Sequence, residues 1–108
     1  MMKPSQPESS NRLTVEISRD LEDIVPIFLR NREQDIRTLH DALTRQDFQT
    51  IQSLGHRLKG DGGGYGFDRI SEIGATMEQA AKQQDHAMVE QQTLALEDYL
   101  RRVHVIYR

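Results

Sequence analysis

The spacing of apolar residues constrains this chain more than any other feature of its sequence. From residue 18 onward they recur at three- and four-residue steps, the period of an α-helix that buries one face. The pattern predicts an all-α fold, an antiparallel up-and-down four-helix bundle with short connections. The apolar positions that carry it are Leu21, Ile24, Val25, Phe28, Leu29, Ile36, Leu39, Leu43, Phe48, Ile51, Leu54, Leu58, Phe67, Ile70, Ile73, Met77, Ala80, Ala81, Val89, Leu96, Leu100, Val103 and Tyr107.

Residues that break or cap helices set the predicted boundaries. Pro26 lacks an N–H group and clashes with the preceding turn, so we expect a short helix at about 18–24 and a longer one from near Pro26 to near residue 45. Asp47 and Asp85 can each cap the helix that follows them, because an aspartate side chain accepts from free N-terminal amides. The remaining long helix begins near Phe67.

The two ends of the chain follow other patterns. Residues 1–12 are polar and hold two of the three prolines, which predicts a disordered tail before a single domain at 13–108. Residues 13–17 alternate apolar and polar side chains, and we expect an extended lead-in that packs on the helices. Residues 103–107 alternate as well as they fit a helix, so the end of the last helix stays open.

Composition excludes several classes of function. The chain has 108 residues, and 14 Lys and Arg against 17 Asp and Glu give a net charge of −3, unlike a nucleic-acid binder with its basic stripe. Cysteine is absent, which excludes disulfides and thiol catalysis. No apolar run reaches the roughly 18 residues of a membrane span, and no signal peptide is evident. We expect a cytoplasmic, monomeric protein that binds neither membrane nor nucleic acid.

One histidine occupies an unusual place on its predicted helix. At roughly 100° per residue, His56 lies about 150° from the middle of the apolar sector, so its imidazole should point to water. The other histidines, His40, His86 and His104, belong to different segments and lack metal-ligand spacing, so we expect solvated or packing roles for them.

Glycines surround His56. Gly55 precedes it, and Gly60 and residues 62–64 follow, although a helix-interior glycine costs roughly 0.8–1.0 kcal/mol relative to alanine. Either something approaches the backbone closely beside His56, or the helix ends at Lys59 and the glycines form a loop. Spacing alone leaves both open and slightly favours the loop. A nucleotide-binding loop is excluded, because no G-x-G-x-x-G or Gly-Lys-Ser/Thr motif is present and no strand precedes the glycines.

These residues together resemble a known signature. The segment His56-Arg57-Leu58-Lys59-Gly60, followed by Gly66, is similar to the H-x-L-K-G-x-x-x-x-x-G motif of histidine phosphotransfer (HPt) domains. The resemblance covers about residues 13 to 107: the segment from Leu21 to Leu29, with its proline, looks like the family's opening. Met77-Glu78 stands where the family commonly has Leu-Glu, and Gly55 stands where it usually has alanine.

The resemblance implies a function for the residues around the histidine. His56 would accept a phosphoryl group from a phosphoaspartate on a receiver domain and pass it to another receiver. Lys59 would attract the phosphoryl group by its charge, and the helix would continue to about Gly64. The face that docks the partner would consist of Gln49, Gln52, Gly60, Gly63 and Gly64.

The same resemblance implies the partners and limits the chemistry. Response-regulator receiver domains would supply Mg²⁺ and most catalytic groups, so the chain needs no cofactor or metal of its own. It would be a phosphocarrier beside a hybrid sensor histidine kinase, without ATP-dependent kinase activity, since no nucleotide motif is present. The alternative is a non-catalytic helical protein-interaction module whose histidine is incidental.

Overall fold

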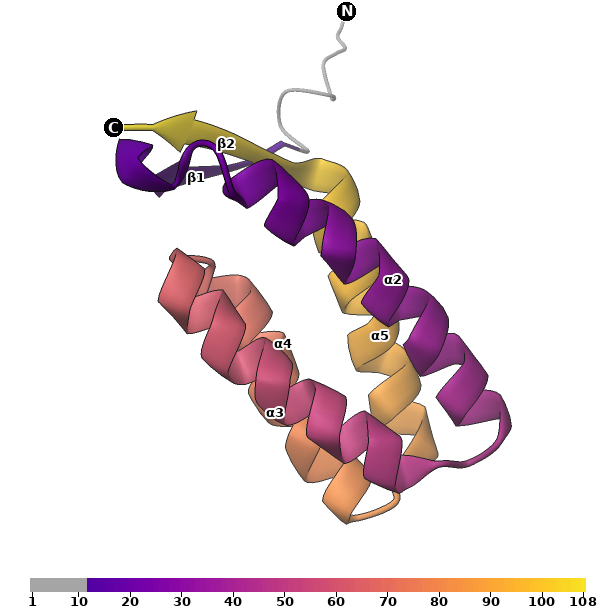
Figure 1. The fold of residues 1–108 in the computed structure, drawn as a ribbon. Coiled ribbons are helices and arrows are strands. Elements are labelled where there is room, and N and C mark those ends of the chain that lie inside the picture. The colour runs from indigo at the N-terminus through magenta and orange to yellow at the C-terminus, as the bar shows by residue number, and fades with distance from the viewer. Residues whose placement is uncertain (1–11) are drawn as a thin grey trace, which may run out of the picture.

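The computed structural model describes residues 12–108, and its helices and strands follow one another as Figure 1 shows. Four α-helices lie within these residues, and α2 runs beside α5 while α3 packs on α4. The tail predicted at residues 1–12 falls, except for Arg12, outside the described residues. The elements are β1 (Leu13–Ile17), the 3₁₀-helix η1 (Arg19–Leu21), α2 (Val25–Thr44), α3 (Phe48–Tyr65), α4 (Asp68–Lys82), α5 (His86–Arg102) and β2 (Val103–Tyr107).

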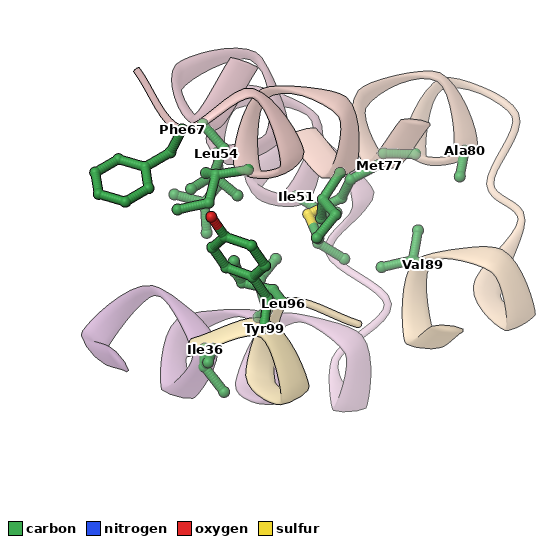
Figure 2. Close-up of a cluster of buried hydrophobic side chains, with 14 of the residues drawn as sticks. Ile36, Ile51, Leu54, Phe67, Met77, Ala80, Val89, Leu96 and Tyr99 are labelled. Carbon is green, nitrogen blue, oxygen red and sulfur yellow. The ribbon is translucent and has the colours of Figure 1, made fainter. Parts of the chain in front are cut away.

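The core lies where the apolar stripes of the four helices meet. Ile51 and Leu58 of α3, Met77 of α4 and Leu96 of α5 are completely buried, and Figure 2 shows labelled side chains of α3, α4 and α5 turned toward one another. Burial of these stripes is the main favourable term in the stability of a small bundle. It also fixes the rotation of α3, because one side of that helix must face the core.

The two predicted aspartate caps are present at the starts of α3 and α5. Asp47 accepts hydrogen bonds from the backbone N–H of Thr50 (3.2 Å) and from its hydroxyl (2.7 Å). These hydrogen bonds lower the pKa of the Asp47 carboxyl. Asp85 accepts from the N–H of Met88 at 3.1 Å. Each cap satisfies an amide that has no partner inside its helix.

α3 and α4 approach each other through three glycines, Gly55 and Gly62 of α3 and Gly74 of α4. A Cβ atom at Gly74 would lie 2.5 Å from the backbone nitrogen of Lys59 and 2.7 Å from the carbonyl oxygen of Gly55. A Cβ atom at Gly55 would lie 2.8 Å from the backbone nitrogen of Glu78. No side chain fits at either position, so the two backbones lie in direct contact at this crossing.

The all-α prediction requires a correction at the chain ends. β1 and β2 form a two-stranded parallel sheet, in which Leu13 lies opposite Val103 and Ile17 lies opposite Tyr107. The predicted lead-in is therefore a strand, and α5 ends at Arg102. The backbone N–H and C=O groups of each strand form hydrogen bonds with the other strand. The alternate apolar side chains of both strands pack on the core.

The short helix predicted at about 18–24 is also wrong in extent. Only Arg19–Leu21 is helical, as one 3₁₀ turn, and Ser18 Oγ caps it by accepting from the N–H of Asp20 at 3.2 Å. No residue of η1 is buried. A helix this short gains little without packing, and Pro26 cannot donate the hydrogen bond that would join it to α2.

The crossing of α3 and α4 predicts opposite effects for two glycine-to-alanine substitutions. Gly74→Ala should lower the free energy of unfolding by about 1–3 kcal/mol, because the new methyl group meets backbone atoms that cannot move independently. Gly60→Ala should raise it by about 0.5–1 kcal/mol, because alanine favours the helix and its Cβ meets no atom within 4 Å. Urea denaturation of both variants measures the difference, and effects of the same sign would contradict this packing.

Candidate functional site

His56 lies in the middle of α3 with its side chain in solvent. Leu54 and Leu58 are buried, whereas the His56 side chain is 70% exposed. This agrees with the orientation expected from the helical wheel, because the core side of α3 turns the imidazole away from the bundle.

The glycine-rich segment after His56 is helical. α3 continues through Gly60 and residues 62–64 to Tyr65, and it ends at Gly66, whose φ of +89° is left-handed. The N–H of Phe67 then donates to the carbonyl of Gly62 at 2.7 Å. Gly66 rather than Gly60 is therefore the terminating residue, and the loop interpretation of the glycines is wrong.

The glycines of α3 divide by the side of the helix they occupy. Gly55 faces α4, as described above, and so does Gly62, where a Cβ atom would lie 2.6 Å from the backbone nitrogen of Ser71. A Cβ atom at Gly60 or Gly64 would meet nothing within 4 Å, and one at Gly63 would meet only Ser71 Oγ, at 3.8 Å. The surface of α3 beyond His56 therefore carries no side chain at these exposed positions.

The five residues predicted to dock a partner share the side of α3 that carries His56. At about 100° per residue, four of them lie within about 40° of His56 around the helix axis, and Gly64 lies about 80° away, toward α2. Gln49 and the three glycines are exposed, and Gln52 is half-buried. They are Gln49, Gln52, Gly60, Gly63 and Gly64.

A glutamate on α4 holds the imidazole in one orientation. Glu78 Oε2 lies 3.1 Å from His56 Nδ1, and the Glu78 side chain is only 14% exposed. A carboxylate can only accept, so Nδ1 carries the hydrogen, and in the neutral imidazole the lone pair is on Nε2, toward solvent. Nε2 is therefore the ring nitrogen that a partner can reach.

Glu78 also contacts the lysine of the signature. Lys59 Nζ lies 3.7 Å from Glu78 Oε1, so one carboxylate faces both His56 and Lys59. The lysine side chain remains half exposed. Sequence reasoning noted Glu78 only within the resemblance and did not place it in the site. Its position there depends on the crossing of α3 and α4.

A second set of charges ties α3 to α2. Arg57 Nη2 donates to Asp35 Oδ1 at 3.1 Å, and Arg32 Nε lies 3.0 Å from Asp35 Oδ2. Burial raises the pKa of the Asp35 carboxyl, although both arginines oppose that shift. The residues on either side of His56 are therefore anchored, Gly55 to α4 and Arg57 to α2.

The other histidines lie on different elements. His40 Nε2 lies 4.0 Å from Glu97 across α2 and α5, His86 begins α5, and His104 is an exposed residue of β2. Within residues 12–108 there is no group of three His, Asp or Glu side chains placed to hold a metal ion.

Comparison with known protein families identifies the family of this chain. The family model described as the Hpt domain matches residues 23–105. The chain belongs to the Hpt family. Hpt domains serve histidine phosphotransfer in phosphorelays, as phosphocarriers that interact with receiver domains and histidine kinases. The predicted membership of this family is thereby confirmed.

Neither the curated proteins nor the solved structures gave a significant match. The Hpt match begins after β1 and η1, so both elements lie outside it. No helix within the described residues is long and apolar enough to span a membrane.

The contact between His56 and Glu78 predicts a tautomer that NMR can measure. The ¹⁵N chemical shifts of neutral His56 should show hydrogen on Nδ1, because Glu78 accepts from that atom. In Glu78→Ala the balance should shift toward the Nε2–H form, while exposed His104 should keep the same shifts in both proteins. An unchanged His56 tautomer in the variant would contradict the role given to Glu78.

Proposed function

We propose that this chain is a phosphorelay intermediate that receives a phosphoryl group on His56 from a receiver-domain phosphoaspartate and passes it to another receiver. The observation that carries the proposal is the exposed imidazole, with Nδ1 held by Glu78 and Nε2 free, beside an open glycine surface. Membership of the Hpt family supplies the class of reaction.

The transfer step uses the free nitrogen of the imidazole. The Nε2 lone pair attacks phosphorus, the phosphorus–oxygen bond to the receiver aspartate breaks, and the aspartate leaves as a carboxylate. The Nδ1 hydrogen stays on the ring against Glu78, whose negative charge stabilises the phosphoimidazolium that forms. Return of the phosphoryl group reverses these bonds with the aspartate of a second receiver. His56 thus needs no general base of its own.

Lys59 offers positive charge to the incoming phosphoryl group. It follows His56 by three residues, about 4.5 Å along the helix axis, and its side chain is half exposed. Its contact with Glu78, at 3.7 Å, is loose enough for the ammonium group to turn toward a phosphoryl oxygen. Phosphoryl transfer depends mainly on positioning and charge neutralisation, and Mg²⁺ bound to the receiver would provide the larger share.

The exposed face of α3 would dock the receiver. Its bare glycine positions let a receiver aspartate approach His56 without meeting side chains, and Gln49 and Gln52 offer hydrogen bonds on the other side of the imidazole. We place the chain in the cytoplasm as a monomeric carrier beside a hybrid sensor histidine kinase. A shuttle of this kind calls for weak, transient contacts.

Transfer to His56 is tested with a purified receiver domain. The receiver is phosphorylated on its aspartate with radiolabelled acetyl phosphate, freed of donor and mixed with the chain in the presence of Mg²⁺. The wild-type chain should gain an acid-labile, alkali-stable label, and His56→Gln should gain none. His104→Gln, which changes another exposed histidine, should be labelled like the wild type.

Two results would count against this function. A folded chain that takes no label from any receiver of its organism would favour the helical interaction module. Label that persists in His56→Gln would place the acceptor elsewhere.

Lys59 should affect the rate of transfer. Lys59→Ala should slow phosphorylation of His56 about tenfold, less than the 10²–10³ typical of a buried donor, because Lys59 is half exposed. Lys82→Ala, which removes an exposed lysine near the end of α4, should leave the rate unchanged. Rapid-quench kinetics with one receiver measure both variants, and equal rates for the two would contradict a role for Lys59.

A further inference from the structure

The two-stranded sheet at the chain ends leaves the outer edge of β2 without a neighbouring strand. Within residues 12–108, β1 is the only strand that pairs with β2, as Figure 1 shows. The N–H of Arg108 donates to the carbonyl of Ile17 at 3.0 Å, which fixes how the backbone groups of the two strands alternate. Successive residues of a strand turn these groups to opposite sides, so those of Val103, Val105 and Tyr107 point away from β1.

Some of these outward groups already have partners in the chain, and the others are open. The N–H of Val103 donates to the carbonyl of Tyr99, and the carbonyl of Tyr107 accepts from Arg19 Nη2 at 3.2 Å. The carbonyl of Val103, both groups of Val105 and the N–H of Tyr107 make no hydrogen bond within the described residues. A row of open backbone groups at a sheet edge is a template for another strand.

A second copy of β2 fits this template. In an antiparallel pair centred on Val105, that residue would exchange both of its hydrogen bonds with the Val105 of the second copy, and the N–H of Tyr107 would donate to the carbonyl of Val103. The pair would leave out only the N–H of Val103 and the carbonyl of Tyr107, which are the groups that already have partners. The edge is therefore complementary to itself about a two-fold axis, as a symmetric dimer requires.

The side chains favour the edge of β2 over that of β1. On the face of the sheet that is turned away from the core, β1 carries Thr14 and Glu16, both exposed, and a charged side chain on an edge strand discourages pairing. On the same face β2 carries His104 and Ile106, and Ile106 is an apolar side chain that does not pack on the core. In the antiparallel pair Ile106 would lie directly opposite the His104 of the second copy, which would cover it.

We propose that two copies of this chain associate through the outer edges of β2 and form a continuous four-stranded sheet. A sheet of two strands is marginally stable, and further strands over an apolar face stabilise it. The core-facing side chains Val103, Val105 and Tyr107 would continue that apolar face into the second copy. The shared edge is short, so the dissociation constant should be on the order of 0.1 mM, and at lower concentrations the chain is the monomeric carrier proposed above.

This edge belongs to a part of the fold remote from His56. β1 packs at the C-terminal end of α3, where a Cβ atom at Gly66 would lie 3.0 Å from Ile17 Cδ1. Gly66 follows His56 by ten residues, about 15 Å along the helix axis. The association therefore goes beyond the proposed function and does not depend on transfer to His56.

A matched pair of proline substitutions tests which edge is used. Val105→Pro removes an outward N–H of β2 and Thr14→Pro removes an outward N–H of β1, and neither group takes part in the pairing of the two strands. In sedimentation equilibrium between about 10 µM and 1 mM, the wild type and Thr14→Pro should form dimers, whereas Val105→Pro should raise the dissociation constant at least about tenfold. Far-UV circular dichroism verifies that both variants are folded.

Three results of this experiment would overturn the proposal. The first is a wild-type chain that stays monomeric at about 1 mM. The second is a folded Val105→Pro that associates like the wild type, and the third is a folded Thr14→Pro that does not associate. In either of the last two cases the interface would not be the outer edge of β2.

A measurement on the wild type locates the contact without any variant. In a mixture of ¹³C-labelled and unlabelled chains at about 1 mM, an isotope-filtered NOE should connect the Hα of His104 to the Hα of Ile106 in the other copy. Residues that face each other without exchanging hydrogen bonds in an antiparallel pair have Cα atoms about 4.5 Å apart, which brings these hydrogens into contact. Association without this NOE would overturn the pairing through β2.

Discussion

The contact between the backbones of α3 and α4 at Gly55 and Gly74 is the constraint on which the site depends. Helices that cross through ordinary side chains lie about 8–10 Å apart, and these two glycines remove the side chains that would separate them. The close crossing brings Glu78 within 3.1 Å of His56 Nδ1. An α4 displaced by one methyl group would lose that hydrogen bond. The glycines lower the stability of their helices, but they allow the close crossing that lets Glu78 orient the His56 imidazole.

The charges around His56 hold an imidazole that is exposed but fixed in orientation by Glu78. Glu78 lies against the inner nitrogen and contacts Lys59, while Asp35 binds Arg57 from α2. Each contact fixes one side of α3 and leaves its outer surface open. A carrier that must serve two partners in turn requires this arrangement, because the partner rather than the chain encloses the reacting group.

Sequence reasoning predicted the parts of the fold that depend on local patterns. The four helices, the caps at Asp47 and Asp85 and the outward direction of His56 follow from periodicity and side-chain chemistry within a few residues. The pairing of residues 13–17 with residues 103–107 joins the two ends of the chain, and the contact of Glu78 with His56 spans 22 residues. Neither leaves a local signal. The glycines of α3 were ambiguous for the same reason, since only the position of α4 separates those that pack from those that stay open.

The nitrogen that carries the phosphoryl group tests the account most directly. The chain, labelled with ¹⁵N and phosphorylated by a receiver, can be examined by ¹⁵N and ³¹P NMR, in which coupling to phosphorus identifies the bonded ring nitrogen. The account predicts phosphorus on Nε2 of His56, with hydrogen retained on Nδ1 beside Glu78. Phosphorus on Nδ1 would contradict it, because that atom would then have to leave Glu78 and turn to solvent.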